Sequence, residues 1–371
     1  MNQSLFLTSG TKKKVQIIHW KLPLEFVTFF GFYEYMIELS KIAKILVIKL
    51  RAIGDVLLST PLLENLKKEY PHLKIDFLCE QFAADVLIGN PWLNDVVKFN
   101  RKTESGLALI RRVRSRRYDM VIDLFGNPRT ALISRLSGAR YRIGFPFRGR
   151  AYAYNHLVHP RGGEVHNVDF NLDVLKYCSV PIISKAPHFP LSDNDRKFSD
   201  DWIQSINLKG KKIIGINAGG GWYTKRWSLD KFASLADKIK QTTGYEILLF
   251  WGPGEDEQAK KIASLMHQQC FMIPSTTLKQ MGALLNHCSY LVTNDSGPMH
   301  ISASLGIPTL GLFGPTNPHL QGPVGEKSSW VRYEELDCLG CNLTKCPIGN
   351  ICMSDLTVEM VHETLSKMIA R

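Results

Sequence analysis

The sequence lacks a long apolar run near its N-terminus. The longest uncharged apolar stretch there covers residues 26–33 (FVTFFGFY), less than half of the roughly 20 residues that a membrane-spanning helix needs. A secretory leader is not expected either, because polar and charged residues interrupt the segment after Lys14 and no A-x-A cleavage pattern follows. These absences predict a cytoplasmic protein.

Two common nucleotide-binding signatures are also missing. No G-K-S or G-K-T follows the glycine-rich segment at residues 219–221, which excludes a P-loop there. No G-x-G-x-x-G with an acidic residue about 20 positions further on is in place, which argues against an NAD-dependent oxidoreductase. A nucleotide-binding protein without catalytic activity stays open as an alternative.

Acidic residues are scarce in one part of the chain. The whole sequence carries 46 Lys and Arg against 34 Asp and Glu, a formal net charge of +12. Between Arg101 and Arg150, thirteen basic residues accompany only Glu104, Asp119 and Asp123, a net charge of +10. This excess predicts an anionic partner such as phosphates, acidic sugars or lipid head groups, with a solvated basic face as the alternative. No nucleic-acid-binding motif accompanies the charge, so nucleic acid is not expected.

Residues 1–43 form an extension ahead of the first clear strand. Within it, residues 22–39 mix Phe, Tyr and Leu with few charges. Such a segment is compatible with an amphipathic helix that rests on a membrane surface. It is equally compatible with a translated upstream stretch, in which case Met36 is the natural start.

From Lys44 onward, strand-like and helix-like segments alternate. The nearly continuous apolar run at residues 44–50 (KILVIKL) is typical of a buried parallel strand, and the pattern restarts at residue 211. Alternation of this kind predicts βαβ units whose parallel sheets bind ligands at the carboxyl ends of strands. The predicted fold is α/β, with two Rossmann-like domains facing each other across a cleft. The predicted parts are the domains 44–190 and 211–355, a linker at 191–210 and a C-terminal helix at 356–371.

The first segment that could carry chemistry is residues 50–61 (LRAIGDVLLSTP). A strand ends and a helix begins here, so Asp55 projects from the N-terminal end of that helix. Aspartate often caps a helix at this place, and capping is the simpler interpretation. The functional interpretation is a carboxylate general base that takes a proton from an acceptor hydroxyl.

A second segment, residues 215–227 (GINAGGGWYTKRW), can bind an anion. Gly219, Gly220 and Gly221 follow a strand and allow backbone N–H groups to approach phosphate oxygens, with Lys225 close behind. A glycine-rich turn alone is weak evidence, because it can serve simply as a tight turn. The added cation and the neighbouring tryptophans favour a binding site.

A third segment, residues 292–318, is more specific. A strand ends at Asp295, Ser296 and Gly297, and a helix carrying His300 begins there. The first amides of that helix, together with its dipole, offer a site for an anion. Taken alone, His300 is equally compatible with a hydrogen-bonded helix residue.

Together these segments resemble the lipopolysaccharide heptosyltransferases, glycosyltransferase family 9. The resemblance covers roughly residues 44–365, and its most specific parts are RAIGDVLLSTP, NDSGPMHISASLGIP, FGPTNP and the cysteine-rich tail. It implies a GT-B type fold with an acceptor-binding first domain and a donor-binding second domain. It also implies inverting, metal-independent transfer of heptose from ADP-L-glycero-D-manno-heptose to Kdo or heptose of a lipid A-linked inner core, without a cofactor. Use of another nucleotide sugar stays as an alternative.

The resemblance assigns roles position by position. Asp55 matches the catalytic base of the family. An acidic residue that contacts the donor ribose in relatives corresponds to Glu255, or to Asp256, because the register is ambiguous by one. The other positions assigned to donor binding are Gly219, Gly220, Gly221, Lys225, Asp295, Ser296, Gly297 and His300.

The arginines of the basic stretch are assigned to the acceptor. Kdo carboxylates and phosphates suit the bidentate guanidinium group, and Arg112, Arg142 and Arg148 are predicted to bind them. The same charge is expected to bring the enzyme to the anionic inner face of the cytoplasmic membrane. The expected partners are therefore a nucleotide sugar, a lipid-linked anionic glycan and an anionic membrane surface.

Two groups of residues carry metal-ligating side chains. The triplet Asp193-Asn194-Asp195 has the D-x-D pattern, but no strand precedes it, so it is interpreted as a solvated linker. The tail cysteines Cys338, Cys341, Cys346 and Cys352 have a spacing that resembles a tetrathiolate metal site. A metal-free tail, with loop thiols or with disulfides formed on oxidation, is the preferred interpretation. No metal is therefore predicted, and the tail is expected to lie far from catalysis.

Overall fold

A computed structural model describes residues 37–371 of the chain. The two alternatives for the extension, a membrane-surface helix or a start at Met36, concern residues that lie outside this range. Among the described residues, no helix is both long enough and apolar enough to cross a membrane.

The first of two six-stranded sheets is parallel throughout, with the strand order β3-β2-β1-β4-β5-β6. Its central strand β1 is buried along almost its whole length, as its apolar sequence predicts. The strands are β1 (Lys44–Ile48), β2 (Lys74–Glu80), β3 (Asp95–Phe99), β4 (Met120–Asp123), β5 (Tyr141–Gly144) and β6 (His156–Leu157).

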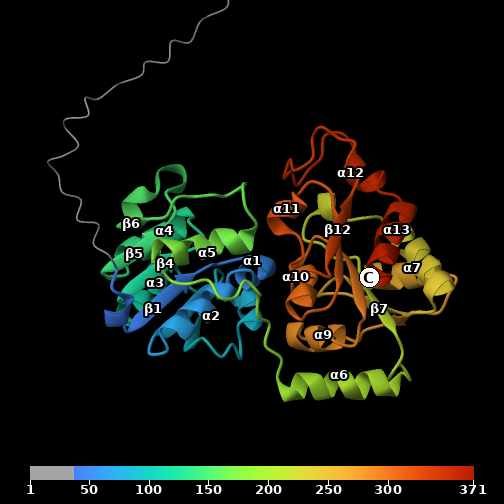
Figure 1. Cartoon of the computed structure of the whole chain (residues 1–371), viewed down its shortest axis with the longest axis horizontal. Helices are drawn as coiled ribbons and strands as arrows, with labels where there is room; N and C mark the ends of the chain where they lie inside the picture. Colours follow the sequence, from blue (N-terminus) through green and yellow to red (C-terminus); the bar gives the residue numbers. More distant parts are fainter. Residues whose placement is uncertain (1–36) are drawn as a thin grey trace, which may run out of the picture. The chain divides into compact units, whose positions relative to one another are not determined.

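Helices cover both faces of this sheet (Figure 1): α2 packs with α5, and α3 packs with α4. The helical segment after β1 is interrupted at residues 58–59, where the hydroxyl of Ser59 donates to the carbonyl of Val56. The helical elements are η2 (Leu39–Lys41), α1 (Ile53–Leu57), α2 (Thr60–Glu69), η3 (Gln81–Val86), α3 (Gly106–Ser115), α4 (Pro128–Leu136), η4 (Phe147–Gly149), η5 (Ala151–Ala153) and α5 (Asn167–Tyr177).

The second sheet repeats the design, with the parallel order β12-β11-β10-β7-β8-β9. Its core joins β7, β8 and β10 to α7 and α13, and Trp227 is fully buried there, with its indole N–H bonded to the carbonyl of Leu356 at 2.8 Å. The strands are β7 (Ile213–Asn217), β8 (Glu246–Phe250), β9 (Phe271–Met272), β10 (Tyr290–Asn294), β11 (Thr309–Phe313) and β12 (Ser329–Arg332).

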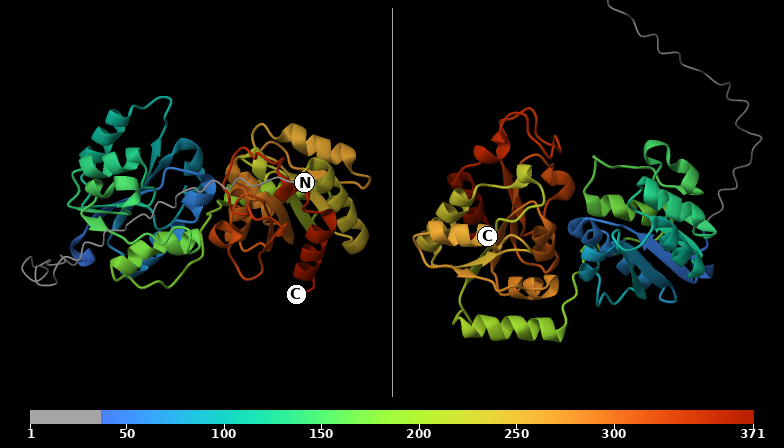
Figure 2. Two further views of the ribbon diagram at one scale, coloured as in Figure 1. Left: turned by 90° about the horizontal axis from the view of Figure 1, so that it is seen from above. Right: turned by 180° about the vertical axis from the view of Figure 1, so that it is seen from behind.

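The helices of this half also form two layers, with α7 packed on α8 and α13, and α9 packed on α6 and α10. The views of Figure 2 show helices on both faces of the yellow-to-orange sheet. The elements are α6 (Asp193–Ser205), η6 (Tyr223–Lys225), α7 (Leu229–Thr243), α8 (Asp256–Leu265), α9 (Leu278–Leu285), α10 (Gly297–Ser304), α11 (Pro318–Gln321), α12 (Ile351–Ser354) and α13 (Val358–Ile369).

Both sheets have the strand order of a Rossmann fold. In each sheet, the first strand (β1 or β7) lies beside the fourth (β4 or β10). The second and third strands extend outward from the first, and the fifth and sixth extend outward from the fourth. Open α/β sheets bind ligands where this order reverses, at the carboxyl ends of the strands. The predicted α/β fold with two Rossmann-like domains is confirmed.

The segment between the two sheets is more ordered than its composition suggests. The acidic triplet predicted as solvated loop begins helix α6, which packs on α9. Ser192 caps this helix, and the Asp195 carboxylate accepts hydrogen bonds from the backbone N–H of Ser192 at 3.0 Å and from its hydroxyl at 2.6 Å. The loop interpretation was wrong because it overlooked this capping box, whose sequence signal is a serine three residues before an acidic side chain.

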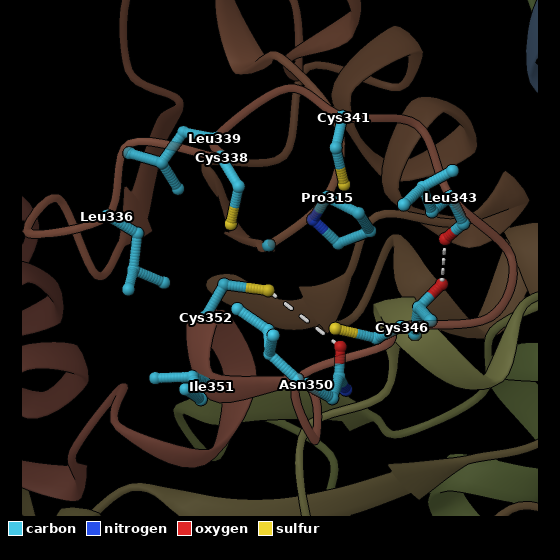
Figure 3. Close-up of a pocket in the computed structure, with 13 residues that line it drawn as sticks. Pro315, Leu336, Cys338, Leu339, Cys341, Leu343, Cys346, Asn350, Ile351 and Cys352 are labelled. Atoms are coloured by element: carbon cyan, nitrogen blue, oxygen red, sulfur yellow. Dashed lines mark hydrogen bonds between the residues drawn. The ribbon is translucent and has the colours of Figure 1, made fainter. Parts of the chain in front are cut away.

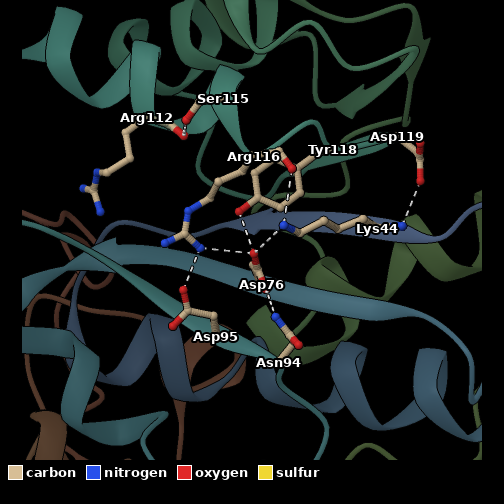
Figure 4. A network of polar contacts seen from close by, with 9 residues as sticks. All are labelled: Lys44, Asp76, Asn94, Asp95, Arg112, Ser115, Arg116, Tyr118 and Asp119. Carbon is tan, nitrogen blue, oxygen red and sulfur yellow. Dashed lines mark hydrogen bonds and ion pairs between the residues drawn. The ribbon is translucent and has the colours of Figure 1, made fainter.

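A polar network lies at the amino-terminal edge of the first sheet, away from the carboxyl ends of its strands (Figure 4). Asp76 on β2 is fully buried, and Tyr118 donates its hydroxyl to the carboxylate at 2.7 Å. Asn94 donates to the other carboxylate oxygen at 2.8 Å, and Arg116 and Lys44 lie 3.3 and 3.5 Å away. A buried carboxylate needs such partners, so the network ties β1, β2 and the start of β4 together.

Candidate active site

Asp55 lies in the first turn of α1, directly after β1. Its Oδ2 accepts a hydrogen bond from the backbone N–H of Ala52 at 2.9 Å, so the side chain caps its own helix. Within residues 37–371, Oδ1 has no hydrogen-bond partner, and the side chain is half-buried. A carboxylate offers two acceptor oxygens, so the capping interpretation is correct without excluding the general base, which stays a prediction.

Two charged residues near Asp55, the half-buried Lys49 and the fully buried Asp123, were not singled out from the sequence. Lys49 follows β1 and donates from Nζ to the carbonyl oxygen of Leu124 at 3.0 Å. Burial lowers the pKa of Lys49, while the carboxylates of Asp55 and Asp123 act in the opposite direction. Asp123 ends β4 and accepts the hydroxyl of Tyr154 at 2.8 Å, and burial raises the pKa of Asp123. Lys49 and the two carboxylates therefore share one electrostatic environment where β1 and β4 end.

Helix α10 of the second domain packs against α1. A Cβ atom added to Gly54 would overlap the ring of His300, so only glycine fits between the two helices. His300 is 6% exposed, and its Nδ1 has no partner among the described residues. Burial lowers the pKa of His300, and the attraction of Asp295 and Asp55 offsets this only in part, so the imidazole is neutral at pH 7.

The glycine turn after β7 packs against Glu255. A Cβ atom added to Gly219 would overlap the Glu255 carboxylate, whose Oε1 accepts a hydrogen bond from the N–H of Gly220 at 3.3 Å. Asp256 instead pairs with Lys260 at 3.0 Å on the exposed side of α8. The structure therefore brings Glu255, and not Asp256, to the glycine turn.

Two buried asparagines fix the path of this turn, and no pattern in the sequence singled out either of them. Asn217 ends β7, and its Oδ1 accepts from the N–H of Gly219 at 3.2 Å. Asn294 ends β10, donates to the carbonyl of Ala218 at 2.8 Å and accepts from the N–H of Trp227 at 3.1 Å. Because buried amides must be hydrogen-bonded, the two side chains fix the turn at the switch point of the second sheet.

Lys225 and Asp295, predicted separately as donor-binding residues, form an ion pair. Lys225 Nζ lies 2.6 Å from Asp295 Oδ2, which also accepts the hydroxyl of Thr316 at 2.7 Å. The Asp295 carboxylate is only 4% exposed, and the ring of Trp222 lies 4.6 Å from the same Nζ. A lysine has three N–H donors, so this arrangement fixes the ammonium and leaves donors for a ligand.

The start of α10 lies beside this ion pair. Ser296 precedes the helix and Gly297 begins it. The Ser296 hydroxyl lies 3.3 Å from that of Thr293 and 3.5 Å from the amide nitrogen of Asn217. The structure thus gathers the glycine turn, Lys225 and the start of α10 at adjacent strand ends, since β7 and β10 are neighbours.

The three arginines predicted to bind the acceptor have different surroundings. Arg112 on α3 is paired with Glu104, with nitrogen–oxygen distances of 2.9 and 2.6 Å. Arg142 on β5 donates to two backbone carbonyls at 3.1 and 2.9 Å. Arg148 is exposed in η4, and no hydrogen bond or ion pair joins it to the described part of the chain. The acceptor roles of all three stay predictions, with Arg148 the one whose guanidinium is unoccupied.

The four tail cysteines line one small cavity (Figure 3), whose lining also includes Thr224, the residue before Lys225. They belong to residues 336–352, called the cysteine loop below. Burial and the three neighbouring thiols raise the pKa of Cys352 to about 11. The Thr224 hydroxyl donates to the carbonyl of Leu343 at 2.8 Å, which ties the loop to the residue beside Lys225. This contact places the tail next to a residue predicted to bind the donor, which the spacing of the cysteines does not reveal. Its separation from catalysis stays a prediction.

Comparison with protein families shows one match: residues 106–351 fit the model described as glycosyltransferase family 9 (heptosyltransferase). This span contains the residues from Gly219 to His300 that are predicted to bind the donor, and it begins after Asp55. Among curated proteins, lipopolysaccharide heptosyltransferase 3 of Escherichia coli is 30% identical over 282 residues, which cover 71% of this chain and 81% of that protein.

Solved structures show the same fold. The glycosyltransferase family 9 protein from Veillonella parvula has a TM-score of 0.79 at 26% identity, covering 90% of this chain and 99% of that one. The ADP-heptose LPS heptosyltransferase II of E. coli has a TM-score of 0.71 at 23% identity, covering 88% of this chain and 98% of that one.

Proposed function

Since the chain belongs to glycosyltransferase family 9, the heptosyltransferases, we propose that it transfers a heptose from ADP-L-glycero-D-manno-heptose to Kdo or heptose in the inner core of a lipopolysaccharide precursor. Membership of the family makes the chain a glycosyltransferase. The names of its relatives support the donor and the acceptor class. The observation that carries the proposal is the cluster of Lys225, the glycine turn and Glu255 at the carboxyl ends of β7 and β8.

In this proposal, the donor binds at the switch point of the second sheet. The diphosphate lies against the N–H groups of the glycine turn, the start of α10 and the ammonium of Lys225. The ribose hydroxyls bond to Glu255, whose carboxylate already lies against Gly220. Asp295 holds Lys225 in place through their 2.6 Å contact, so the cation needs little reorganisation when the leaving group gains charge.

The reaction is a single displacement at the anomeric carbon of the heptose. The acceptor oxygen forms a bond to C1 as the bond from C1 to the phosphate oxygen breaks, and ADP leaves with the electron pair. Asp55 takes the proton of the acceptor hydroxyl, through the oxygen that does not cap α1. One base and no nucleophilic side chain give inversion at C1. Lys225 and the amides stabilise the charge that develops on ADP, so we propose that no metal ion takes part in this step.

His300 connects the two halves of the proposed site. It packs on Gly54, next to Asp55, and the Asp295 carboxylate acts electrostatically on its ring. A neutral imidazole can donate one N–H to the donor without adding a charge that would compete with Lys225 for Asp295. This supports its assignment to donor binding.

One prediction tests the glycine turn. Replacement of Gly219 by alanine is expected to displace the Glu255 carboxylate and to weaken ADP binding by roughly tenfold, about 1.4 kcal/mol. Gly106→Ala is the matched control, because a Cβ added at Gly106 meets nothing within 4 Å and Gly106 begins α3, outside the residues assigned to the donor. Calorimetric titration with ADP measures both. Equal ADP affinities for the two variants would mean that Glu255 does not belong to the nucleotide site.

The acceptor domain also has a surface suited to an anionic membrane. On the neighbouring helices α3 and α4, Leu107 is 66% exposed and Leu132 is 44% exposed, and Arg111 and Arg135 are exposed beside them. Apolar side chains beside basic ones favour the surface of an anionic bilayer. We therefore place the enzyme at the inner face of the cytoplasmic membrane, where its acceptor is anchored.

This placement predicts binding that depends on charge. The full chain should sediment with phosphatidylglycerol vesicles at low salt and less so as salt rises, because screening acts over about 8–10 Å at physiological ionic strength. The double variant Arg111→Glu/Arg135→Glu should bind less at every salt concentration. Failure of the unmodified chain to bind these vesicles at low salt would refute the membrane contact.

A further inference from the structure

The cysteine loop has little secondary structure to hold it in place. Between the end of β12 and the start of α12 it contains no helix or strand. Leu336 and Leu339 pack against the core, but Leu343 and Ile348 are 45% and 49% exposed. Connections longer than about 12–15 residues without secondary structure are uncommon and are usually functional. We therefore expect a cross-link to help hold the cysteine loop in this conformation.

The four thiols of the loop face one another. Figure 3 shows all four sulfur atoms directed into the same cavity, which has a volume of about 20 Å³. That is enough for one atom-sized occupant. The other walls are mostly apolar, including Pro315, Leu336 and Ile351. Water is a poor occupant, because thiols are weak hydrogen-bond partners.

The loop geometry turns the cysteines inward. Cys338 and Cys341 enclose Gly340, whose φ of 76° is the left-handed conformation that glycine adopts readily. Cys352 lies two residues after Asn350, which also has a left-handed backbone, with φ of 61°. Two turns thus bring cysteines from distant positions in the loop to the wall of one cavity, and the first two form a C-x2-C pair of the kind found in tetrathiolate sites.

We propose that the four cysteines of this loop bind one thiophilic metal ion, zinc or iron, in this cavity. On binding, each thiol loses its proton to solvent and forms one metal–sulfur bond, so four thiolates around a divalent ion carry a net charge of −2. Among residues 37–371, no three His, Cys, Asp or Glu side chains already stand at the spacing of metal ligands. Binding of the ion therefore requires the four thiolates to move inward, and this movement brings the two turns closer together.

The ion has a structural role next to the donor site. Thr224, beside Lys225, donates to the carbonyl of Leu343. Pro315, in the segment that also carries Thr316, accepts from the N–H of Asn342 at 2.8 Å. Fixing the loop thus fixes two segments that position Lys225 and Asp295. This consequence rests on the proposed function, whereas the binding of the ion does not.

Elemental analysis of the purified full chain tests the site. After gel filtration in a weak chelator, we expect about one equivalent of zinc or iron per chain. The variant Cys338→Ser/Cys341→Ser should lose it, and the control Cys178→Ser, at a half-buried cysteine after α5, should keep it. Acid-labile sulfide would contradict the proposal, because the cavity admits one ion and not an iron–sulfur cluster.

Two further measurements do not depend on whether the double variant folds. Cobalt added to the metal-free wild-type chain should give the thiolate-to-metal charge-transfer bands of a tetrahedral site. Bound metal should also protect four cysteines from alkylation. A wild-type chain that shows neither effect and contains no stoichiometric metal would overturn the proposal. Weaker ADP binding after metal removal would support the structural role, and unchanged ADP binding by a chain that does hold metal would disprove that role alone.

Discussion

Replacing Asp55 by asparagine is expected to lower turnover by a hundredfold or more, the scale of a lost general base. The amide keeps an oxygen that can accept from the N–H of Ala52, so the cap at the start of α1 survives. What disappears is the ability to take a proton from the acceptor hydroxyl. Steady-state turnover at saturating donor and acceptor measures the effect.

The loss should be confined to the chemical step. ADP affinity and the denaturation midpoint of Asp55→Asn should match those of the wild type, because the donor residues belong to the other domain. Asp230→Asn is the matched control, since Asp230 also lies in the first turn of a helix, α7, but is exposed. If Asp55→Asn retained near wild-type turnover, Asp55 would be a helix cap and nothing more.

The largest effect on stability is expected at Asp76. Replacing it by alanine should lower the free energy of unfolding by about 3–5 kcal/mol, because it leaves buried partners without their carboxylate. Tyr118 and Asn94 lose their hydrogen bonds, and Lys44 loses its nearest anion. The side chains of Arg116 and Lys44 are 29% and 26% exposed, so partial rehydration favours the lower end of this range. Urea denaturation measures the change.

Asp95 provides the comparison. Its carboxylate lies 2.6 Å from Arg116, and this hydrogen bond lowers the pKa of Asp95, but the side chain is 45% exposed. Exposed ion pairs contribute about 0–1 kcal/mol, so Asp95→Ala should be nearly neutral. If the two variants lost equal free energy of unfolding, the contribution of each carboxylate in the network of Figure 4 would not depend on its burial. ADP binding should not change in either variant, since the network lies at the opposite edge of the sheet from Asp55.

The sequence was informative about the fold wherever strands are apolar and long. Buried strands such as β1 and β7 could be predicted because a short, continuous apolar run that ends at a turn is typical of a strand covered on both faces. Short strands were missed: β6 and β9 have two residues each, and β3 carries charges at two of its five positions. These segments become strands because each pairs with a longer neighbouring strand. The residues of the short segment alone do not reveal that neighbour.

Some residues of the candidate site could likewise be predicted from the sequence, and others could not. Glycine turns and a helix start have local signatures, so the residues that the structure gathers at the ends of β7 and β10 could be picked out from the sequence. Lys49, Asp123, Asn217 and Asn294 were missed, because a polar residue at a strand end is common. These residues come together at the site only because β1 lies beside β4 and β7 lies beside β10 in the folded sheets. The choice between Glu255 and Asp256 likewise needed the contact with Gly220, since the two positions differ by one residue.

Incubation of the purified chain with ADP-L-glycero-D-manno-heptose and Kdo-bearing or heptose-bearing lipid A acceptors tests the central claim most directly. Mass spectrometry should show an acceptor heavier by one heptose, and one ADP should be released for each transfer. The new linkage should have the anomeric configuration opposite to that of the donor, as single displacement with Asp55 as base requires. Transfer from a different nucleotide sugar only, or ADP binding without transfer to any acceptor, would contradict the account.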